Sequence, residues 1–444
     1  MRQRKFILKS IFTWCVVLAL FASCTKSTDP QISQLSQDES NELVTDWMNL
    51  SLILTQEAPG FTAPISARAY SYICLGLHES TVQAFPGHSS VMSKINEGHK
   101  ANLPRFNGDI NWNILVNEYM YHIMGSFYKN GKPSMKRNLD EFYSENLVSM
   151  EANQNPEVVK RSKDFGAKMA KAIFDFSKTD GQEYGHMNNY PDNYRGPIGA
   201  GLWNAAKITE LKPLQPFWGN VRTYFKENVN LHLTSTPPVF SDAKSSVFYS
   251  YALEVKNKAQ NMNYNEEMMV RYWNDEAPGT FTPAGHHMSI LTQLLKTEKK
   301  NLAESAEAYM KLGLCMHDVT VAIWKTKYTF NTIGADEYIR TYIDKNFLTL
   351  MKSPATPEFS SGQSAIASAA AEILGEVFGF DYAFTDKTYD HRKDVIGAPR
   401  SFQNFQQMAE EASLANLYGG IHYRFSIEEG IKQGIQIGEN INKL

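Results

Sequence analysis

Residues 359–374 read FSSGQSAIASAAAEIL, and this stretch contains the features that decide the fold of the chain. Two serines and a glycine, Ser360 to Gly362, lead directly into an alanine-rich run with helical character. A helix that begins here presents free backbone N–H groups and the positive end of its dipole to whatever lies in front of it, which favours an anion. The next side chain is Gln363, an amide that does not titrate. The stretch therefore predicts a helix that points at a polar pocket and lacks an acid–base group at its first turn.

Most of the chain carries apolar residues at helical spacing, and alternating stretches typical of strands are few. The predicted fold class is therefore all-α, a helical bundle. Segments with helical spacing cover residues 40–56, 64–83, 110–128, 133–151, 156–176, 243–259, 263–274, 286–296, 300–329, 362–379, 401–418 and 427–440. Between residues 178 and 242, glycine, proline, asparagine and aromatic residues cluster without a period, which predicts a long irregular loop too aromatic for a flexible linker.

Length and charge limit the possible classes of function. The chain has 444 residues, enough for about two or three domains, and its 43% hydrophobic and 20% charged residues are typical of a globular protein. Its formal net charge is −3, and no run of Lys or Arg follows residue 30. Because binding to a phosphate backbone requires a basic surface, the composition argues against a nucleic-acid partner.

The N-terminus has the pattern of an exported protein. A basic region contains Arg2, Arg4, Lys5 and Lys9. The apolar run that follows, residues 11–22, is shorter than the ~20 residues that span a bilayer. Residues 20–24, LFASC, resemble a bacterial lipobox, in which the cysteine is lipidated after cleavage. We therefore predict a signal peptide over residues 1–23, a polar tether over residues 24–40 that starts at lipidated Cys24, and a location in the bacterial cell envelope, lipid-anchored to the membrane outside the cytoplasm. Plain secretion is the alternative.

Cysteines and histidines outside this segment show no metal-binding pattern. Cys74 and Cys315 both lie in apolar helical segments, which favours two buried thiols over a disulfide. The chain contains no CxxC, HExxH or calcium-loop motif. His286 and His287 are adjacent, so their side chains point in different directions on a regular element and are expected to be structural or to line a pocket.

Three short segments near the C-terminus stand in a fixed order: WKTKYTFNTIGADEYIR at 324–340, FSSGQSAIASAAAEIL at 359–374, and EEASLANLYGGIHYRFSIEEG at 410–430. Together they resemble the phosphatidic acid phosphatase type 2 and vanadium-dependent haloperoxidase superfamily, and most closely its secreted bacterial haloperoxidase-like branch. That family builds an oxyanion pocket from three motifs: Lys, six residues, Arg-Pro; then Pro-Ser-Gly-His; then Ser-Arg, five residues, His, three residues, Asp. The order and the internal spacings of the three motifs match. The resemblance implies a helical bundle around one pocket.

In the first motif, the resemblance places the anion-binding lysine of the family on Lys327. The family's arginine and proline fall on Gly334 and Ala335. In the second motif, Ser361 and Gly362 retain the family's hydroxyl group and its close backbone approach to the anion. The oxyanion-binding positions implied by these two motifs are therefore Lys327, Gly334, Ser361 and Gly362. At Gly334 the guanidinium group of the family's arginine is missing.

The family's acid–base histidine falls on Gln363. In the third motif, His422 matches the histidine that bonds vanadate in the peroxidases and attacks phosphorus in the phosphatases. The family's arginine falls on Asn416 and its aspartate on Ser426, so no residue of the motif fixes the tautomer of His422. The catalytic positions implied by the resemblance are thus His422 and Gln363, with Asn416 as a further oxyanion-binding position.

These replacements predict a nearly silent oxyanion site. Hydrogen bonds to charged groups contribute about 1.5–3 kcal/mol each, so the loss of two arginines removes roughly 3–6 kcal/mol of anion binding. Loss of the acid–base histidine removes a further ~10²–10⁴ in rate. Whether the chain is an enzyme stays open, with inactivity expected. No cofactor is expected, except vanadate on His422 if the ancestral site persists.

Three functions remain possible at this stage. The first is an envelope-anchored homologue of the haloperoxidases and acid phosphatases whose degenerate site is non-catalytic or binds an unknown small polar ligand or envelope protein. The second is an active phosphatase or haloperoxidase that uses His422 and Lys327 in a rearranged site, with Lys325, Arg340, Arg392, Arg400 or Arg424 supplying the missing charge. The third is a structural helical lipoprotein that acts through protein partners. Residues 41–290 are expected to form an N-terminal helical region, and residues 291–444 the haloperoxidase-like helical core.

Overall fold

The computed structural model describes residues 39–85, 88–95, 101–203, 212–233, 235–276, 279–393, 395 and 399–444. The predicted signal peptide, Cys24 and the tether up to residue 38 lie outside these residues. Thirteen α-helices make up most of the described chain, and two strands of three residues each form its single small sheet. The predicted all-α fold class is confirmed.

Most of the predicted helices are present within a few residues of their expected ends. In chain order they are α2 (Glu42–Glu57), α3 (Ala63–Thr81), α4 (Trp112–Phe127), α5 (Pro133–Glu151), α6 (Pro156–Lys178), α7 (Val247–Gln260), α8 (Tyr264–Tyr272), α9 (Pro283–Thr297), α10 (Leu302–Phe330), α11 (Ala335–Tyr342), α12 (Gly362–Phe378), α13 (Phe405–Tyr418) and α14 (Arg424–Asn442). The described part of residues 178–242 contains only three short 3₁₀ helices, η2 (Gly185–Met187), η3 (Trp218–Asn220) and η4 (Asn228–Leu233), so the predicted irregular region is confirmed.

Two elements differ from the prediction. Helix α11 has only two turns and was not expected from the sequence. The helix expected from residue 401 begins at Phe405, because β2 (Arg400–Phe402) pairs antiparallel with β1 (Phe384–Asp386). Three-residue strands are too short to give an alternating pattern that can be read from the sequence.

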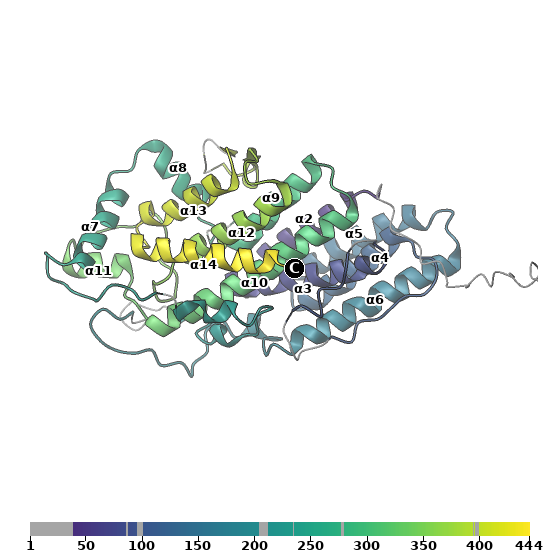
Figure 1. Cartoon of the computed structure of the whole chain (residues 1–444), viewed down its shortest axis with the longest axis horizontal. Coiled ribbons are helices and arrows are strands. Elements are labelled where there is room, and N and C mark those ends of the chain that lie inside the picture. Colours follow the sequence, from purple (N-terminus) through teal and green to yellow (C-terminus); the bar gives the residue numbers. More distant parts are fainter. Residues whose placement is uncertain are drawn as a thin grey trace, which may run out of the picture.

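The molecule is elongated, with α2 to α6 at one end and α7, α8 and α11 at the other (Figure 1). Helix α10 runs between the two ends and packs against α3 on one side and α12 on the other. It has 29 residues, which is a length of about 44 Å. Its start is fixed by a capping box, in which Asn301 accepts from the Glu304 amide and Glu304 accepts from the Asn301 amide. The larger of two hydrophobic clusters extends from Val44 in α2 to Ile441 in α14, and the second includes Phe248 in α7 and Tyr338 in α11.

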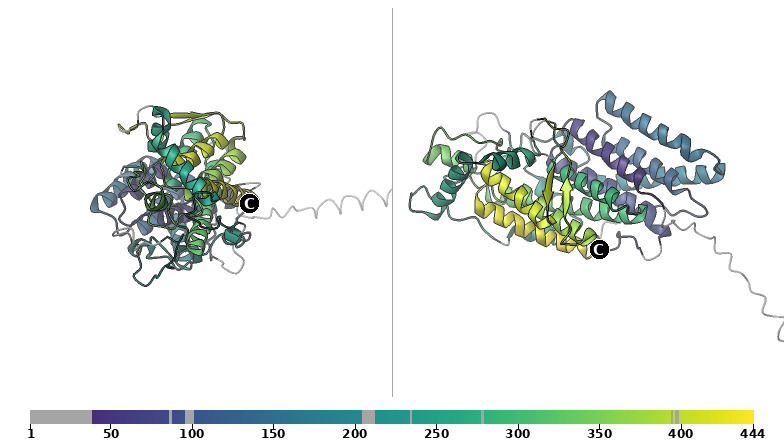
Figure 2. Two further views of the ribbon diagram at one scale, coloured as in Figure 1. Left: turned by 90° about the vertical axis from the view of Figure 1, so that its left-hand side faces the viewer. Right: turned by 90° about the horizontal axis from the view of Figure 1, so that it is seen from above.

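Helices α12 and α14 pack closely along their whole length, side by side in the view from above (Figure 2). Three glycines on α14, Gly430, Gly434 and Gly438, face α12 at intervals of four residues. A Cβ atom at Gly434 would lie 2.2 Å from the Ala365 carbonyl oxygen, and one at Gly430 would lie 2.5 Å from the Ser361 carbonyl oxygen. The glycines therefore allow α14 to hold the first turn of α12 in place.

Two further sequence predictions can be compared with the structure. Cys74 and Cys315 are free, buried thiols, as predicted. His286 and His287 are both fully buried on α9, and the residues that contact them are described below. Within the part of the chain that the structure covers, no helix is both long enough and apolar enough to span a membrane.

We predict that Gly434→Ala destabilises the protein, by about 1–3 kcal/mol, because the new methyl group would overlap the backbone of α12. Gly125→Ala in α4 is the matched control, because its Cβ would meet only a Leu139 side-chain carbon at 3.7 Å. That control should gain up to about 1 kcal/mol from helix propensity. Urea unfolding followed by tryptophan fluorescence measures both variants. A gain in stability for Gly434→Ala would mean that the two helices are not in close contact.

Candidate functional site

A cavity of about 60 Å³ opens where the first turn of α12 meets α10 and α13. By the usual requirement of ~10–15 Å³ per water, it has room for a few water molecules or a small ligand. Its lining residues are Ala63, Asn274, Asp275, Glu276, Pro283, Trp324, Lys327, Met351, Lys352, Pro354, Thr356, Gly362, Gln363, Ile366, Asn416, Ile421 and His422. Helices α10, α12 and α13 all contribute to this lining, so the prediction that they surround one pocket is confirmed.

The cavity brings together five of the residues singled out from the sequence: Lys327, Gly362, Gln363, Asn416 and His422. The other two lie outside its lining. Ser361 caps α12, where its hydroxyl accepts from the Ser364 amide at 3.4 Å and bonds the Ser364 hydroxyl at 2.8 Å. Gly334 precedes α11, and its carbonyl oxygen accepts from the Tyr423 hydroxyl at 3.3 Å. An oxyanion-binding role for these two residues remains a prediction.

Lys327 is buried near the end of α10 and is not a solvated surface lysine. Its ammonium group donates to the carbonyl oxygens of Pro357 and Glu358, both at 2.9 Å. Burial lowers the pKa of Lys327 to about 8, although the carboxylates of Glu358 and Glu276 oppose this shift. Backbone carbonyls thus occupy two of the three donors of Lys327, and two nearby carboxylates balance its charge.

His422 is oriented by a residue outside the three motifs. Its Nδ1 lies 2.7 Å from Oε1 of the buried Glu358, and the same oxygen accepts from the Tyr423 amide at 3.1 Å. Because a carboxylate only accepts, Nδ1 carries the proton and Nε2 keeps its lone pair towards the cavity. The expectation that nothing fixes the tautomer of His422 was therefore wrong. Glu358 does so from the loop before α12, in place of the missing aspartate. Burial lowers the pKa of His422, with the hydrogen bond that His422 donates to Glu358 opposing the shift.

Gln363 is held by acceptors on the wall of the cavity. Its Nε2 donates to the Trp273 carbonyl oxygen at 2.9 Å and to Oδ2 of Asp275 at 3.1 Å. Since both partners only accept, the amide nitrogen must face them, and the Gln363 carbonyl oxygen is left for the cavity. Gln363 therefore presents an acceptor where the family's histidine would act on an anion.

Acidic groups form one wall of the cavity. Asp275 and Glu276 both belong to the loop that follows α8. Desolvation raises the pKa of Glu276, and the charges of Lys327 and Lys352 oppose that shift. An anion entering the cavity would therefore face two carboxylates in addition to Lys327.

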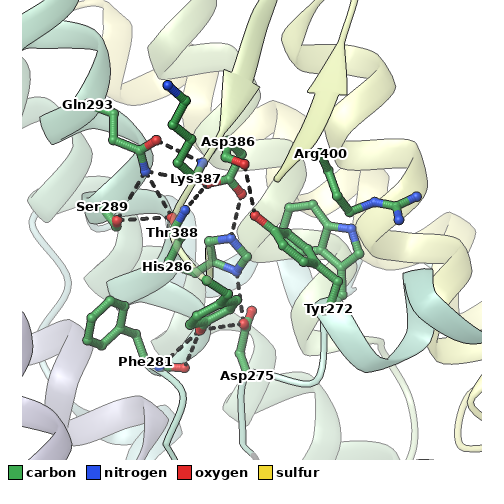
Figure 3. Close-up of polar contacts among 12 residues, drawn as sticks. Tyr272, Asp275, Phe281, His286, Ser289, Gln293, Asp386, Lys387, Thr388 and Arg400 are labelled. Carbon is green, nitrogen blue, oxygen red and sulfur yellow. Dashed lines mark hydrogen bonds and ion pairs between the residues drawn. The ribbon is translucent and has the colours of Figure 1, made fainter. Parts of the chain in front are cut away.

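Behind this wall, His286 lies fully buried between two aspartates (Figure 3). Its Nδ1 is 2.8 Å from Oδ1 of Asp275, and its Nε2 is 2.8 Å from Oδ2 of Asp386 on β1. Burial alone would lower the pKa of His286, but the two carboxylates outweigh it and raise the pKa to about 10. Burial likewise favours a higher pKa for Asp386, yet His286 lowers it to about 2. The imidazole is therefore a cation that holds two carboxylates in place.

Further polar contacts complete this cluster. The Tyr389 hydroxyl donates to Oδ1 of Asp275 at 2.9 Å, and the Thr388 amide donates to Oδ1 of Asp386 at 2.8 Å. The Trp273 ring stacks on His286 with its centroid 4.6 Å away. The neighbouring His287 is buried with no hydrogen-bond partner for either ring nitrogen among the described residues, and burial lowers its pKa to about 3. His286 is thus the charged member of the pair and His287 the neutral one.

The five cations considered as replacements for the lost arginines all lie outside the cavity lining. Arg400 forms two bonds with Glu411, Arg424 pairs with Glu254, and Arg340 pairs with Asp336. Lys325 donates to Asn220, and Arg392 donates to the Arg271 carbonyl and stacks over Tyr389. Lys352 lines the cavity instead, and neither it nor Glu276, Asp275 or Glu358 was identified from the sequence.

Comparisons with known proteins agree with this geometry. Residues 333–444 match the family model of the VCPO second helical-bundle domain. The crystal structure of the first bacterial vanadium-dependent iodoperoxidase superposes with a TM-score of 0.81 at 24% sequence identity, over 93% of this chain and 98% of that chain. The chain has the vanadium haloperoxidase fold. Holo and apo bacterial vanadium-dependent chloroperoxidases superpose on this fold with TM-scores of 0.66 and 0.65, both at 12% identity. The holo structure aligns over 92% of this chain and 98% of its own, and the apo structure over 87% and 93%. No curated protein sequence matches the chain.

The residues of the cavity do not fit vanadate. In place of two arginines the chain has Gly334, which lies outside the lining, and Asn416, whose amide donates to the Ala412 carbonyl at 3.1 Å. Glu276 adds a negative charge, and Gln363 turns its donor away from the cavity. An oxyanion requires donors and cations, whereas this cavity offers mainly acceptors on the side of Asp275. In addition, no group of three or more His, Cys, Asp or Glu side chains is placed to hold a metal ion in the described ranges.

We predict that His286→Gln destabilises the protein by about 3–5 kcal/mol near neutral pH, because two buried carboxylates lose their cation. The folded-state pKa of about 10 lies above the ordinary value of 6.5, so the stabilisation is fully present below pH 6.5 and is lost as the pH rises through 10. Urea unfolding at pH 6.5 and at pH 10 measures this, and the difference between the two proteins should shrink at the higher pH.

The matched control for this experiment is His391→Gln, since His391 is exposed and lies near the same sheet. It should change the free energy of unfolding by no more than about 0.5 kcal/mol at either pH. If His286→Gln lowers the free energy equally at both pH values, His286 is neutral in the folded protein, and the description of the cluster as an ion pair is wrong.

Proposed function

We propose that this chain is a non-catalytic member of the haloperoxidase fold whose former oxyanion cavity binds a small polar ligand. The observation that supports this most directly is the hydrogen bond from Gln363 to Asp275. Gln363 stands where the family has its acid–base histidine, and this bond fixes the Gln363 amide with its acceptor oxygen towards the cavity. Haloperoxidase chemistry in the similar structures is a property of those proteins. It is not carried to this chain, because the two arginines and the acid–base histidine of the family's motifs are replaced by Gly334, Asn416 and Gln363.

Energetics supports the loss of oxyanion chemistry. Two missing charge-assisted contacts remove roughly 3–6 kcal/mol of anion binding, which is about two to four decades in affinity. Glu276 acts in the same direction, since its negative charge at the exposed edge of the cavity opposes an anion. Lys327 alone cannot offset these losses, because its ammonium group is already bonded to two carbonyl oxygens.

A second candidate function rests on Glu358. By fixing the Nδ1–H tautomer of His422, it leaves Nε2 as a free lone pair in the cavity, as a nucleophilic histidine requires. A phosphatase that uses His422 as nucleophile is therefore the alternative function. It lacks a visible acid for the leaving group, since Gln363 does not titrate and faces Asp275.

We expect no halogenation above background when the purified full-length chain is given vanadate, peroxide and either iodide or bromide. We also expect hydrolysis of a phosphate monoester at the same rate for the unmodified chain and for His422→Ala. Colorimetric detection of halogenated dye and of released phosphate measures the two reactions. Activity in the unmodified chain that falls at least tenfold in His422→Ala, but not in the control Lys325→Met outside the cavity lining, would establish the catalytic alternative instead.

We further propose that the chain is a lipoprotein of the bacterial cell envelope, anchored through Cys24 with its helical domain outside the cytoplasm. The support is the order of basic region, short apolar run and LFASC in residues 1–24. Polar residues 25–40 would act as the tether to the folded domain, which begins near α2.

Metabolic labelling with an alkyne analogue of palmitate tests this proposal. The unmodified chain should be labelled and should fractionate with membranes, whereas Cys24→Ala should lose the label. Cys15→Ala, which changes a cysteine within the predicted signal peptide, is the control and should leave labelling unchanged. Equal labelling of Cys24→Ala and the unmodified chain would show that residues 20–24 are not a lipobox.

A further inference from the structure

The lining of the cavity carries both positive and negative groups. Lys327, Lys352 and the start of α12 supply the positive ones, and Asp275 and Glu276 supply the negative ones. Apolar side chains complete the lining, including Trp324, Met351, Ile366 and Ile421. We propose that the cavity binds a small zwitterion with an apolar body, of the size of an α-amino acid. This inference rests on the proposed function and specifies the class of its ligand.

The start of α12 supplies donors for a carboxylate. The amides of Gly362 and Gln363 have no acceptor in the part of the chain covered by the structure, since the first capped amide is that of Ser364. Gly362 lines the cavity, and a Cβ atom added at this glycine would meet nothing nearer than an Ile323 carbon at 3.7 Å. A carboxylate at this position would meet two backbone donors, the positive end of a 17-residue helix and the remaining donor of Lys327.

The loop after α8 and the Gln363 side chain supply acceptors for an ammonium group. Glu276 provides a carboxylate, and Gln363 provides the amide oxygen that its bond to Asp275 leaves free. His286 holds Asp275 in place by bonding its other oxygen at 2.8 Å. An ammonium group has three donors and no acceptor, so it matches this set. A tetrahedral oxyanion is negatively charged and would be repelled by the carboxylates of Asp275 and Glu276.

Polar groups of the lining without protein partners also point to a ligand. The Thr356 hydroxyl lines the cavity and is a buried atom without a hydrogen-bond partner among the described residues. Buried polar groups are normally hydrogen-bonded, so water or a polar ligand is expected to satisfy it. Asn416, which is 2% exposed, and His422 line the same cavity, and neither the Asn416 side-chain oxygen nor Nε2 of His422 has a hydrogen bond within the described residues.

The test is isothermal titration calorimetry of the purified full-length chain with four probes. They are L-leucine, 4-methylpentanoate, 3-methylbutan-1-amine and inorganic phosphate. The acid and the amine are leucine without its ammonium and without its carboxylate, respectively. We expect leucine to bind at least tenfold more tightly than either, because each lacks a charge-assisted contact.

Two variants test which residue of the cavity binds the ammonium group of the ligand and which binds its carboxylate. Glu276→Gln should weaken leucine binding about 10- to 100-fold and strengthen phosphate binding, because the repelling charge is removed. Lys327→Met should weaken both leucine and 4-methylpentanoate. Lys325→Met on the same helix and Glu410→Gln on the exposed face of α13 are matched controls and should change nothing. Circular dichroism confirms that each variant is folded before titration.

The possible outcomes separate this inference from the proposed function. If leucine binds no better than both partial probes, or if none of the four probes binds, the zwitterion inference is overturned while the loss of oxyanion chemistry stands. If phosphate binds the unmodified chain more tightly than leucine and this binding is lost in Lys327→Met, the oxyanion site persists and both proposals are overturned. Tight leucine binding that is weakened by Glu276→Gln supports both.

Discussion

The buried contact between His286 and its two aspartates is the interaction on which the cavity depends. It joins the loop after α8, helix α9 and the small sheet through two bonds of 2.8 Å. Through Asp275 it also reaches the first turn of α12, because Asp275 accepts from Gln363. A buried charge without a partner is strongly destabilising, whereas a fully bonded cluster is tolerated and fixes one arrangement of the elements that it joins. The acidic wall is therefore held in place and is not an accidental feature of a surface loop.

This arrangement gives the cavity its own electrostatic character within a haloperoxidase-like framework. The start of α12 points at the cavity, and the glycines of α14 let the two helices approach closely. These features depend on backbone geometry and packing, which side chains in the cavity do not affect. The chemistry depends on a few groups at the lining, and these can be replaced one by one. The backbone can therefore superpose on an iodoperoxidase with a TM-score of 0.81 although two arginines of the oxyanion motifs are absent. The TM-score depends on the course of the backbone, whereas oxyanion binding depends on side chains.

The sequence predicted the framework better than the site. Helical spacing and capping residues are local signals, so α10 and α12 could be located to within a few residues. The three motif spacings then predicted that Lys327, Gln363, Asn416 and His422 share one cavity, which they do. Glu358, Asp275 and Glu276 were missed, because they lie in loops, where no period assigns a side chain to a face. Glu358 was the easiest of these to find, since it stands three residues before Ser361 and is the acidic residue closest to that motif.

Which atom of a polar side chain faces a cavity also cannot be obtained from the sequence. Gln363 was expected to be an uncharged hydrogen-bonding group, and it is one, but its effect on a ligand depends on whether its nitrogen or its oxygen is free. Asp275 decides this, because it accepts a hydrogen bond from the amide nitrogen of Gln363. Asp275 is in turn held by His286. Asp275 and His286 lie 88 and 77 residues before Gln363 in the sequence. A residue on α9 therefore sets the hydrogen-bonding character of a side chain on α12. In this fold, the polarity of the cavity is determined by its second layer of charges as much as by the residues that line it.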